Sequence, residues 1–213
     1  MKGLWIILCG LGCLTGAAQT TFKEKAEITA QKQVSINFPF TDEIEIKIWD
    51  KQEVYLQANV TINEGADDGM FAIKKSISGS KIDFSMDNER WNAHAKKRDN
   101  WTSDIFITIY LPSTMEVSAK TISGNIITTY FDQPLALKTI SGNIDLTIDA
   151  NKGLDFRAKT ISGDVYSDIE ISFPQGKDGL RKMVGMDVAG RIRHGGKKSS
   201  FETISGSVFL RKG

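Results

Sequence analysis

The chain has 213 residues, with 27 lysines and arginines against 26 aspartates and glutamates. A formal net charge of +1 leaves no basic excess to pair with phosphates, so the composition excludes a typical nucleic-acid-binding protein. With 40% hydrophobic and 25% charged residues, the chain can form one or two folded domains and is unlike a disordered polypeptide.

The first eighteen residues have the layout of a secretory signal peptide. One positive charge at Lys2 precedes the apolar run Leu4–Leu14, and the small residues Gly16 and Ala18 occupy the two positions that signal peptidase reads. The apolar run is about half the length that a membrane-spanning helix needs, and no later stretch comes closer. We therefore expect cleavage near Ala18 and a mature chain that begins near Gln19, has no transmembrane segment and is exported to the cell envelope, periplasm or extracellular space.

Both cysteines, Cys9 and Cys13, lie in this leader, so the mature chain has no thiol for disulfides, metal binding or catalysis. Lipidation of Cys13 is an alternative to cleavage after Ala18, but Gly10 stands where a lipoprotein signal has a large aliphatic residue. An exported protein without disulfides is typical of a bacterial envelope.

One phrase recurs through the rest of the chain. Four copies read Lys120–Ile126 (KTISGNI), Lys138–Ile144 (KTISGNI), Lys159–Val165 (KTISGDV) and Glu202–Val208 (ETISGSV), and Lys75–Lys81 (KSISGSK) is a worn fifth. Their glycines are about 20 residues apart or about twice that, and a degenerate copy around Gly185 would divide the last long interval. The expected corner glycines are Gly79, Gly124, Gly142, Gly163 and Gly206.

Apolar residues alternate with polar ones before each copy, as in Val117, Ala119 and Thr121, which indicates strands. A period of about 20 residues with strands in each unit predicts an all-β fold, a β-solenoid (parallel β-helix-like) whose coils stack about 4.8 Å apart. Glycine would form each corner, where a side chain would obstruct the backbone. The serine before it and the asparagine or aspartate after it would bond the turning chain.

Residues 19–213 are expected to form a single domain, less regular over 19–103 and clearly repetitive over 104–213. The alternating sets Ile44–Ile48 and Val54–Ile62 predict long strands with one buried face, which form either the first coils or a sheet that caps the stack. At the other end, Arg211 and Lys212 are charges of the kind that blunt an exposed edge.

The register of the repeat leaves one question open. Strict alternation buries the threonines and places Ile122, Ile140, Ile161 and Ile204 outside, as an apolar stripe that could contact a partner. The alternative, which we favour, is that each strand bends at Thr-Ile and turns the isoleucine inward.

These residues resemble a known family. The TISG[N/D][I/V] phrase, the strand Ile107–Pro112 (ITIYLP), the step Gly195–Gly196 and the export signal are together similar to the DUF4097 family of bacterial exported β-strand repeat proteins, whose members are named as adhesins. The match is strongest from about residue 104 to the end. The resemblance implies a β-helix-like solenoid at the envelope or cell surface, with no recognised cofactor and no established catalytic residues.

Catalytic and metal sites find little support in the sequence. When the four copies are aligned on the corner glycine, the residue after the glycine is Asn125, Asn143, Asp164 or Ser207. The residue two positions after that one is Ile127, Asp145, Tyr166 or Phe209. No two acids share a phase in neighbouring units, so no carboxylate pair at glycosidase spacing is predicted. His94 and His194 are far apart and lack ligand-like neighbours. We expect no enzymatic activity, no metal and no cofactor, and we interpret the Asn/Asp series as a polar ladder between coils.

Two features could contact a ligand. Stacked coils would bring Lys120, Lys138 and Lys159 close together, as a solvated row or as a site for an acidic glycan. The polar insertion over residues 87–102 is either a loop whose tryptophans pack on the body or a sugar or protein contact. Its candidate ligand residues are Trp91, Trp101, Lys96, Lys97 and Arg98.

The sequence thus predicts an exported, non-enzymatic β-solenoid that binds a glycan or protein of the envelope or extracellular surface, as an adhesin or scaffold. The alternatives are a periplasmic accessory protein of an envelope-signalling system and a polysaccharide-active β-helix enzyme.

Overall fold

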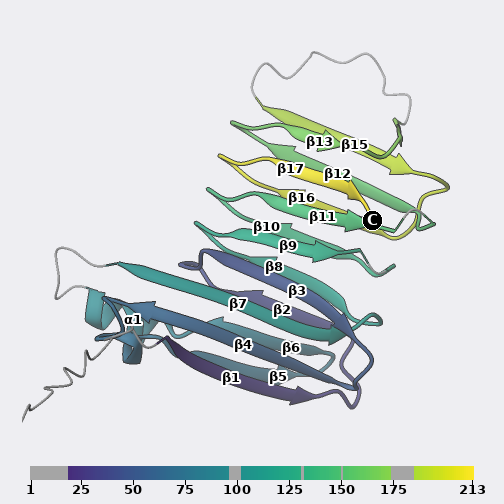
Figure 1. Ribbon diagram of the computed structural model, residues 1–213. Coiled ribbons are helices and arrows are strands. Elements are labelled where there is room, and N and C mark those ends of the chain that lie inside the picture. Colours follow the sequence, from purple (N-terminus) through teal and green to yellow (C-terminus); the bar gives the residue numbers. More distant parts are fainter. Residues whose placement is uncertain (1–18, 96–101, 131, 150, 174–184) are drawn as a thin grey trace, which may run out of the picture.

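Two β-sheets lie face to face and account for most of the chain (Figure 1). The computed structural model describes residues 19–95, 102–130, 132–149, 151–173 and 185–213. The predicted leader, with Cys13 and the cleavage position, lies outside these ranges. In the described residues, no helix is both long and apolar enough to span a bilayer.

The first sheet, sheet A, contains eight strands in the described chain. In spatial order they are β1 (Thr20–Glu27), β4 (Glu53–Ile62), β7 (Ser103–Pro112), β3 (Glu43–Trp49), β9 (Asn125–Thr129), β11 (Ile144–Ile148), β17 (Val208–Lys212) and β13 (Val165–Ser167). Antiparallel pairing joins β1 to β4 and β4 to β7, and every later neighbour is parallel.

The second sheet, sheet B, contains nine described strands. In spatial order they are β14 (Ile171–Ser172), β15 (Met186–Ile192), β12 (Leu154–Thr160), β16 (Lys198–Glu202), β10 (Leu135–Lys138), β8 (Glu116–Lys120), β2 (Gln33–Asn37), β6 (Lys81–Met86) and β5 (Ile73–Ser78). Its centre is parallel and both ends are antiparallel. A 3-10 turn (Asp68–Met70) and the helix α1 (Asn88–Ala95) complete the fold. The expected all-β class is confirmed, with two mixed sheets.

Five segments follow the plan that the repeat predicts: a strand of sheet B, a corner, then a strand of sheet A. These strand pairs are β2–β3, β8–β9, β10–β11, β12–β13 and β16–β17. The pair β2–β3 lacks the glycine phrase but pairs in register with β8–β9 in both sheets. Beyond it, β1, β4 and β5 add antiparallel strands. The N-terminal part therefore both begins the repetition and covers its end.

The strand pairs do not follow one another in chain order. The C-terminal pair β16–β17 lies between β10–β11 and β12–β13, so that Ser200 pairs with Ala136 on one side and with Arg157 on the other. After β13 the chain forms the antiparallel β15, which covers the outer edge of β12, and then returns to the place between β12 and β10. The stacking order expected from the sequence was wrong at this point. Strand β17 is internal, so Arg211 does not blunt an edge but pairs with Asp145 (Nε–Oδ2, 2.8 Å).

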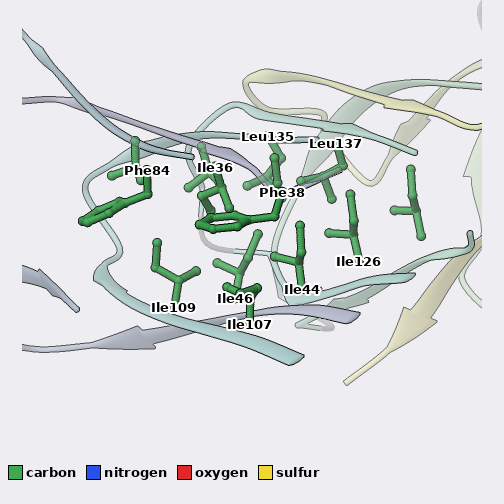
Figure 2. Close-up of a cluster of buried hydrophobic side chains, with 14 of the residues drawn as sticks. Ile36, Phe38, Ile44, Ile46, Phe84, Ile107, Ile109, Ile126, Leu135 and Leu137 are labelled. Carbon is green, nitrogen blue, oxygen red and sulfur yellow. The ribbon is translucent and has the colours of Figure 1, made fainter. Parts of the chain in front are cut away.

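The core lies between the sheets and consists of the inward residues of each strand. Alternation predicts these positions because successive side chains of a strand point to opposite faces. Figure 2 shows part of the core, with labelled side chains Ile36, Phe38, Ile44, Ile46, Phe84, Ile107, Ile109, Ile126, Leu135 and Leu137, all at most 2% exposed. Ile48 departs from the predicted pattern and is exposed near the end of β3.

Buried threonines and closely packed glycines form the corners. The Oγ1 of Thr139 donates to the carbonyl of Gly124 (3.0 Å) and accepts from the N–H of Gly142 (3.2 Å), and Thr203 donates to the carbonyl of Gly142 (2.9 Å). A buried hydroxyl is costly unless it is hydrogen-bonded, and here each corner supplies its partner. The threonines of this column, all at most 5% exposed, are Thr41, Thr121, Thr139, Thr203 and Thr160.

Two predicted corners have other roles. Gly79 has a φ of 55° and lies in the two-residue turn of the β5–β6 hairpin, where Ser78 pairs with Lys81. Gly185 has a φ of 74° and precedes β15, which runs antiparallel to β12. Neither is therefore a stacked copy of the repeat. Hairpin turns and parallel corners both favour glycine, and the sequence phrase alone does not distinguish them.

Candidate ligand-binding surface on sheet B

The predicted lysine row lies on the outer face of sheet B, but the C-terminal strand divides it. Lys120 and Lys138 are direct partners in neighbouring parallel strands. Glu202 is the partner of Lys138 on its other side and of Lys159 beyond that. The Nζ of Lys138 is 3.1 Å from the Oε2 of Glu202. The three lysines thus share one row, with an acid placed where the sequence predicts direct contact between Lys138 and Lys159.

A groove runs across the strands beside this row. Its floor is a line of small side chains in register, two residues before the lysine row: Ser35, Ser118, Ala136 and Ser200. The groove has a volume of about 340 Å³ and is also lined by Gln33, Lys81, Glu116 and Lys198. Since parallel strands lie about 4.8 Å apart, the floor is about 14 Å long. Small side chains between two rows of long ones leave room for an extended chain.

Cations outnumber acids among the groups around the groove that lack an ion-pair partner. In the described chain, Lys120, Lys159 and Lys198 form no ion pair with an acid. Glu116 accepts a hydrogen bond from the Nε2 of Gln33 (2.9 Å). These lysines are exposed or half-buried, so ligand binding through them would be screened by salt.

The end of the groove at β6 carries an ionised carboxylate. Burial alone would raise the pKa of Asp83, but hydrogen bonds from Ser35 and Lys81 outweigh it, and the pKa lies below its ordinary value. The Nζ of Lys81 is 3.0 Å from Asp83 Oδ1. This end is therefore locally neutral, and the excess positive charge lies toward β8, β16 and β12.

The isoleucines of the repeat point outward. Ile122, Ile140, Ile204 and Ile161 are 38–45% exposed and form a row in this order, here called the isoleucine ridge. Backbone hydrogen bonds of 3.2 Å connect each to the next, from Ile140 N to Ile122 O, from Ile204 N to Ile140 O and from Ile161 N to Ile204 O. The inward orientation expected from the sequence was therefore wrong. The threonine of each phrase points inward because its hydroxyl donates a hydrogen bond to a carbonyl of the neighbouring corner. Since side chains alternate between the two faces, the isoleucine that follows points outward.

The polar ladder expected after the corner glycines is confirmed, in the new spatial order. Asn143 N donates to the Oδ1 of Asn125 (2.9 Å), Ser207 N to the Oδ1 of Asn143 (2.9 Å), and Asp164 N to the Oγ of Ser207 (3.3 Å). These side chains satisfy backbone donors at the corners. This bonding accounts for the asparagines of the phrase, whereas Asp164 contributes only its backbone N–H and its carboxylate accepts from the Oη of Tyr166 (3.0 Å). Among the described residues, no group of three or more His, Asp or Glu side chains is placed to hold a metal ion.

Of the candidate ligand residues in the insertion before β7, Trp91 alone lies in the described part of the chain. Trp91, in α1, is 2% exposed and stacks on Phe40 with ring centroids 5.3 Å apart and an interplanar angle of 13°. It therefore packs on the body of the protein, which was one of the two readings of this insertion. The other candidates, Lys96, Lys97, Arg98 and Trp101, lie outside the described residues.

The sequence did not lead us to predict the groove floor. Its signal is present, because Ser118, Ala136 and Ser200 each stand two residues before the first residue of a repeat phrase. Ser35 shows no such signal because its segment lacks the phrase. Only the pairing of β2 with β8 brings it into the same line.

Of the comparisons with known proteins, the one with solved structures shows a protein of similar fold. No family model matches the sequence, so membership of DUF4097 is not confirmed, and no curated protein matches it. A solved structure described as a "putative cell adhesion protein" from Clostridium sporogenes is similar over 92% of this chain and 100% of its own, with a TM-score of 0.58 and 10% sequence identity. A "putative adhesin" from Bacteroides fragilis is matched over 92% and 98% of the two chains, with 11% identity and a TM-score of 0.37.

Proposed function

We propose that the chain is an exported, non-enzymatic β-solenoid of the adhesin type, which binds an acidic glycan chain along the groove of sheet B. The observation that carries the proposal is the line of small side chains flanked by the lysine row. Lys120 and Lys138 are direct partners along one side of the floor, and Lys198 lines the groove on the other. Two residues along a strand span about 6.8 Å, so both rows are within reach of a ligand on the floor.

Repetition favours an extended ligand over a small one. Parallel strand pairs in register present equivalent side chains at regular steps, as coils of a solenoid do. A polymer with one charge per sugar could contact several steps at once, and weak contacts would combine into useful affinity. The ion pair between Lys138 and Glu202 is exposed to solvent and therefore weak, so an anionic ligand can take the place of Glu202 beside Lys138 at small cost.

Export is supported by the leader layout, and the adhesin type by the repeat phrase. The fold resembles that of the Clostridium protein. At 10% identity that likeness informs the fold alone, so the ligand is proposed from the groove.

The test is binding of purified residues 19–213 to immobilised acidic and neutral glycans and to matrix proteins. We expect saturable, salt-sensitive binding to acidic glycans, and a loss of about tenfold or more in the triple variant Lys120→Gln, Lys138→Gln, Lys159→Gln. A matched control carries the same charge change away from the groove: Lys74→Gln, Lys152→Gln and Lys212→Gln. Equal binding by the two triple variants would contradict the proposal.

A second candidate function follows from the isoleucine ridge. A periplasmic accessory protein of an envelope-signalling system would bind one protein partner and no glycan, and an exposed apolar row suits such a contact. Crosslinking in the native envelope distinguishes the two. Under this alternative, Ile140→Lys abolishes one specific crosslink, while the lysine variant keeps it.

A further inference from the structure

A cluster of three aromatic rings lies on the outer face of sheet A, at the end formed by its longest strands. Trp49 from β3, Tyr55 from β4 and Tyr110 from β7 are half-buried outward residues. The ring centroid of Trp49 is 6.1 Å from that of Tyr55 and 5.3 Å from that of Tyr110, and the two tyrosine centroids are 6.0 Å apart. The cluster lies on the face opposite to the core, where alternation usually places polar side chains.

Each of these rings has a lysine ammonium over its face. The distances from Nζ to ring centroid are 4.7 Å for Lys51 on Trp49, 5.8 Å for Lys25 on Tyr55 and 5.9 Å for Lys47 on Tyr110. The negative face of an aromatic ring attracts such a cation and holds it in place. The result is a cluster of aromatic rings with a positive charge over each of them, on flexible lysine side chains that a ligand can move aside.

Two lysines on this face are not balanced by an acid. Lys47 pairs with Glu45 (2.8 Å) and Lys25 lies 3.7 Å from Glu53. By contrast, Lys51 forms no ion pair with an acid in the described ranges of the chain, and the same holds for Lys23 on β1. A ligand with a carboxylate could therefore bind here without first displacing an acid of the protein.

Hydrogen-bonding side chains continue the surface along β4. Tyr55 Oη donates to the Oε1 of Gln57 (3.3 Å), and the Nε2 of Gln57 donates to the Oδ1 of Asn59 (3.2 Å). Lys23 is the partner of Gln57 in the neighbouring strand. Successive members of this row are about 6.8 Å apart. Aromatic surface followed by amides is the combination that a sugar chain requires, since its rings have apolar C–H faces and hydroxyl edges.

We infer that Trp49, Tyr55 and Tyr110 form a second binding site, for a glycan chain that contains a carboxylated sugar. One sugar ring packs on the aromatic surface with its carboxylate toward Lys51, and the hydroxyls of the next sugar bond the amides of Gln57 and Asn59. The three strands that build the site lie side by side in sheet A, with β7 between β4 and β3, and their pairing sets the positions of the three rings. The site lies on the other sheet from the groove and does not depend on the lysine row.

The experiment uses a short oligogalacturonate, in which every sugar carries a carboxylate, and a neutral cello-oligosaccharide of equal length. Calorimetry with residues 19–213 should detect the acidic oligosaccharide, with affinity for the neutral one about tenfold weaker. Lys51→Gln removes one of the two unpaired cations. Added to the Lys120→Gln, Lys138→Gln, Lys159→Gln variant, whose groove is disabled, it should weaken the remaining oligogalacturonate binding about tenfold without loss of fold. Trp49→Ala should weaken both ligands by at least that factor. The matched controls are Lys212→Gln and Tyr166→Ser, at an exposed lysine and an exposed tyrosine elsewhere.

Since Trp49 donates from Nε1 to the carbonyl of Glu53 (2.9 Å), its replacement could disturb the β3–β4 loop, and thermal unfolding must be measured for each variant. If Trp49→Ala is destabilised, the inference is tested with Lys51→Gln alone. Absence of oligogalacturonate binding, or equal binding by Lys51→Gln and Lys212→Gln when each is added to the groove variant, would overturn the inference. Loss of binding in the Lys120/Lys138/Lys159 variant, with no change in Lys51→Gln, would assign the ligand to the groove and also overturn it.

Discussion

A Cβ atom built on Gly206 would lie 1.9 Å from the carbonyl oxygen of Gly142, although the two glycines are in different strand pairs. The same distance separates a Cβ on Gly142 from the carbonyl oxygen of Gly124. The obstructing atoms are backbone, which cannot rotate away. These corners are closed by the neighbouring corner itself, so they need glycine for close approach and not for an unusual φ.

Gly142→Ala should therefore lower the free energy of unfolding by about 3 kcal/mol or more, because backbone in two strand pairs must shift. Urea denaturation measures the effect. Gly69→Ala is the matched control, since its nearest obstacle is the end of the Arg90 side chain at 4.0 Å. Equal stability of the two variants would show that the corners are not packed as described.

The threonine column makes a separate prediction. Thr139→Val keeps the volume of the side chain but removes both the donor to Gly124 and the acceptor for Gly142 N–H. A buried group left without its partner costs about 1–3 kcal/mol, so we expect a loss of stability in this range. Thr129→Val, at an exposed position of β9, should change stability by less than about 0.5 kcal/mol. Both are measured by denaturation at neutral pH.

Much of this architecture can be predicted from residues alone. Alternation locates the strands, and the phrase places Thr121 and Gly124 at a corner. The order of the strand pairs cannot be predicted in the same way, because every copy of the phrase offers the next one the same hydrogen bonds. One residue does carry information: Glu202 replaces the lysine of the other copies, and between Lys138 and Lys159 it separates like charges. The aromatic cluster is also hidden in the sequence, since three separate strands contribute Trp49, Tyr55 and Tyr110.

Ile140→Lys tests the orientation of the isoleucine ridge. Ile140 is 38% exposed, so a lysine there can extend into water and the protein should stay folded, with a change of about 1 kcal/mol or less. Leu137→Lys, three residues earlier and 1% exposed, should cost more than about 3 kcal/mol because it buries an unpaired charge. Circular dichroism and thermal unfolding compare the two. Loss of fold in Ile140→Lys would favour the inward orientation.

Asp155 makes stability depend on pH. A hydrogen bond from Arg191 (Nε–Oδ1, 2.8 Å), opposed by partial burial and assisted by the N–H of Gly196 (3.2 Å), holds the pKa of Asp155 below its ordinary value. A carboxyl with a lowered folded-state pKa stabilises the protein above its unfolded pKa of about 4, and this stabilisation is lost as the pH falls through the folded pKa. Asp155→Asn should thus be less stable than the parent at pH 7, and the difference should shrink in acid. A constant difference across this range would contradict the assignment.

The C-terminal pair tests the order of the strands. Phe201, Val208 and Leu210 are at most 1% exposed, and β16 and β17 are each hydrogen-bonded on both sides. A chain that ends at residue 197 would leave the edges of β10 and β12 unpaired and the core between them open, so we expect aggregation and loss of a single cooperative transition. Removal of residues 212–213 alone should have little effect. If strand pairs instead stacked in chain order, the last pair would be terminal, and its removal would leave residues 19–197 folded with a proportionally smaller unfolding enthalpy. Calorimetric scans of the two truncated chains separate these outcomes.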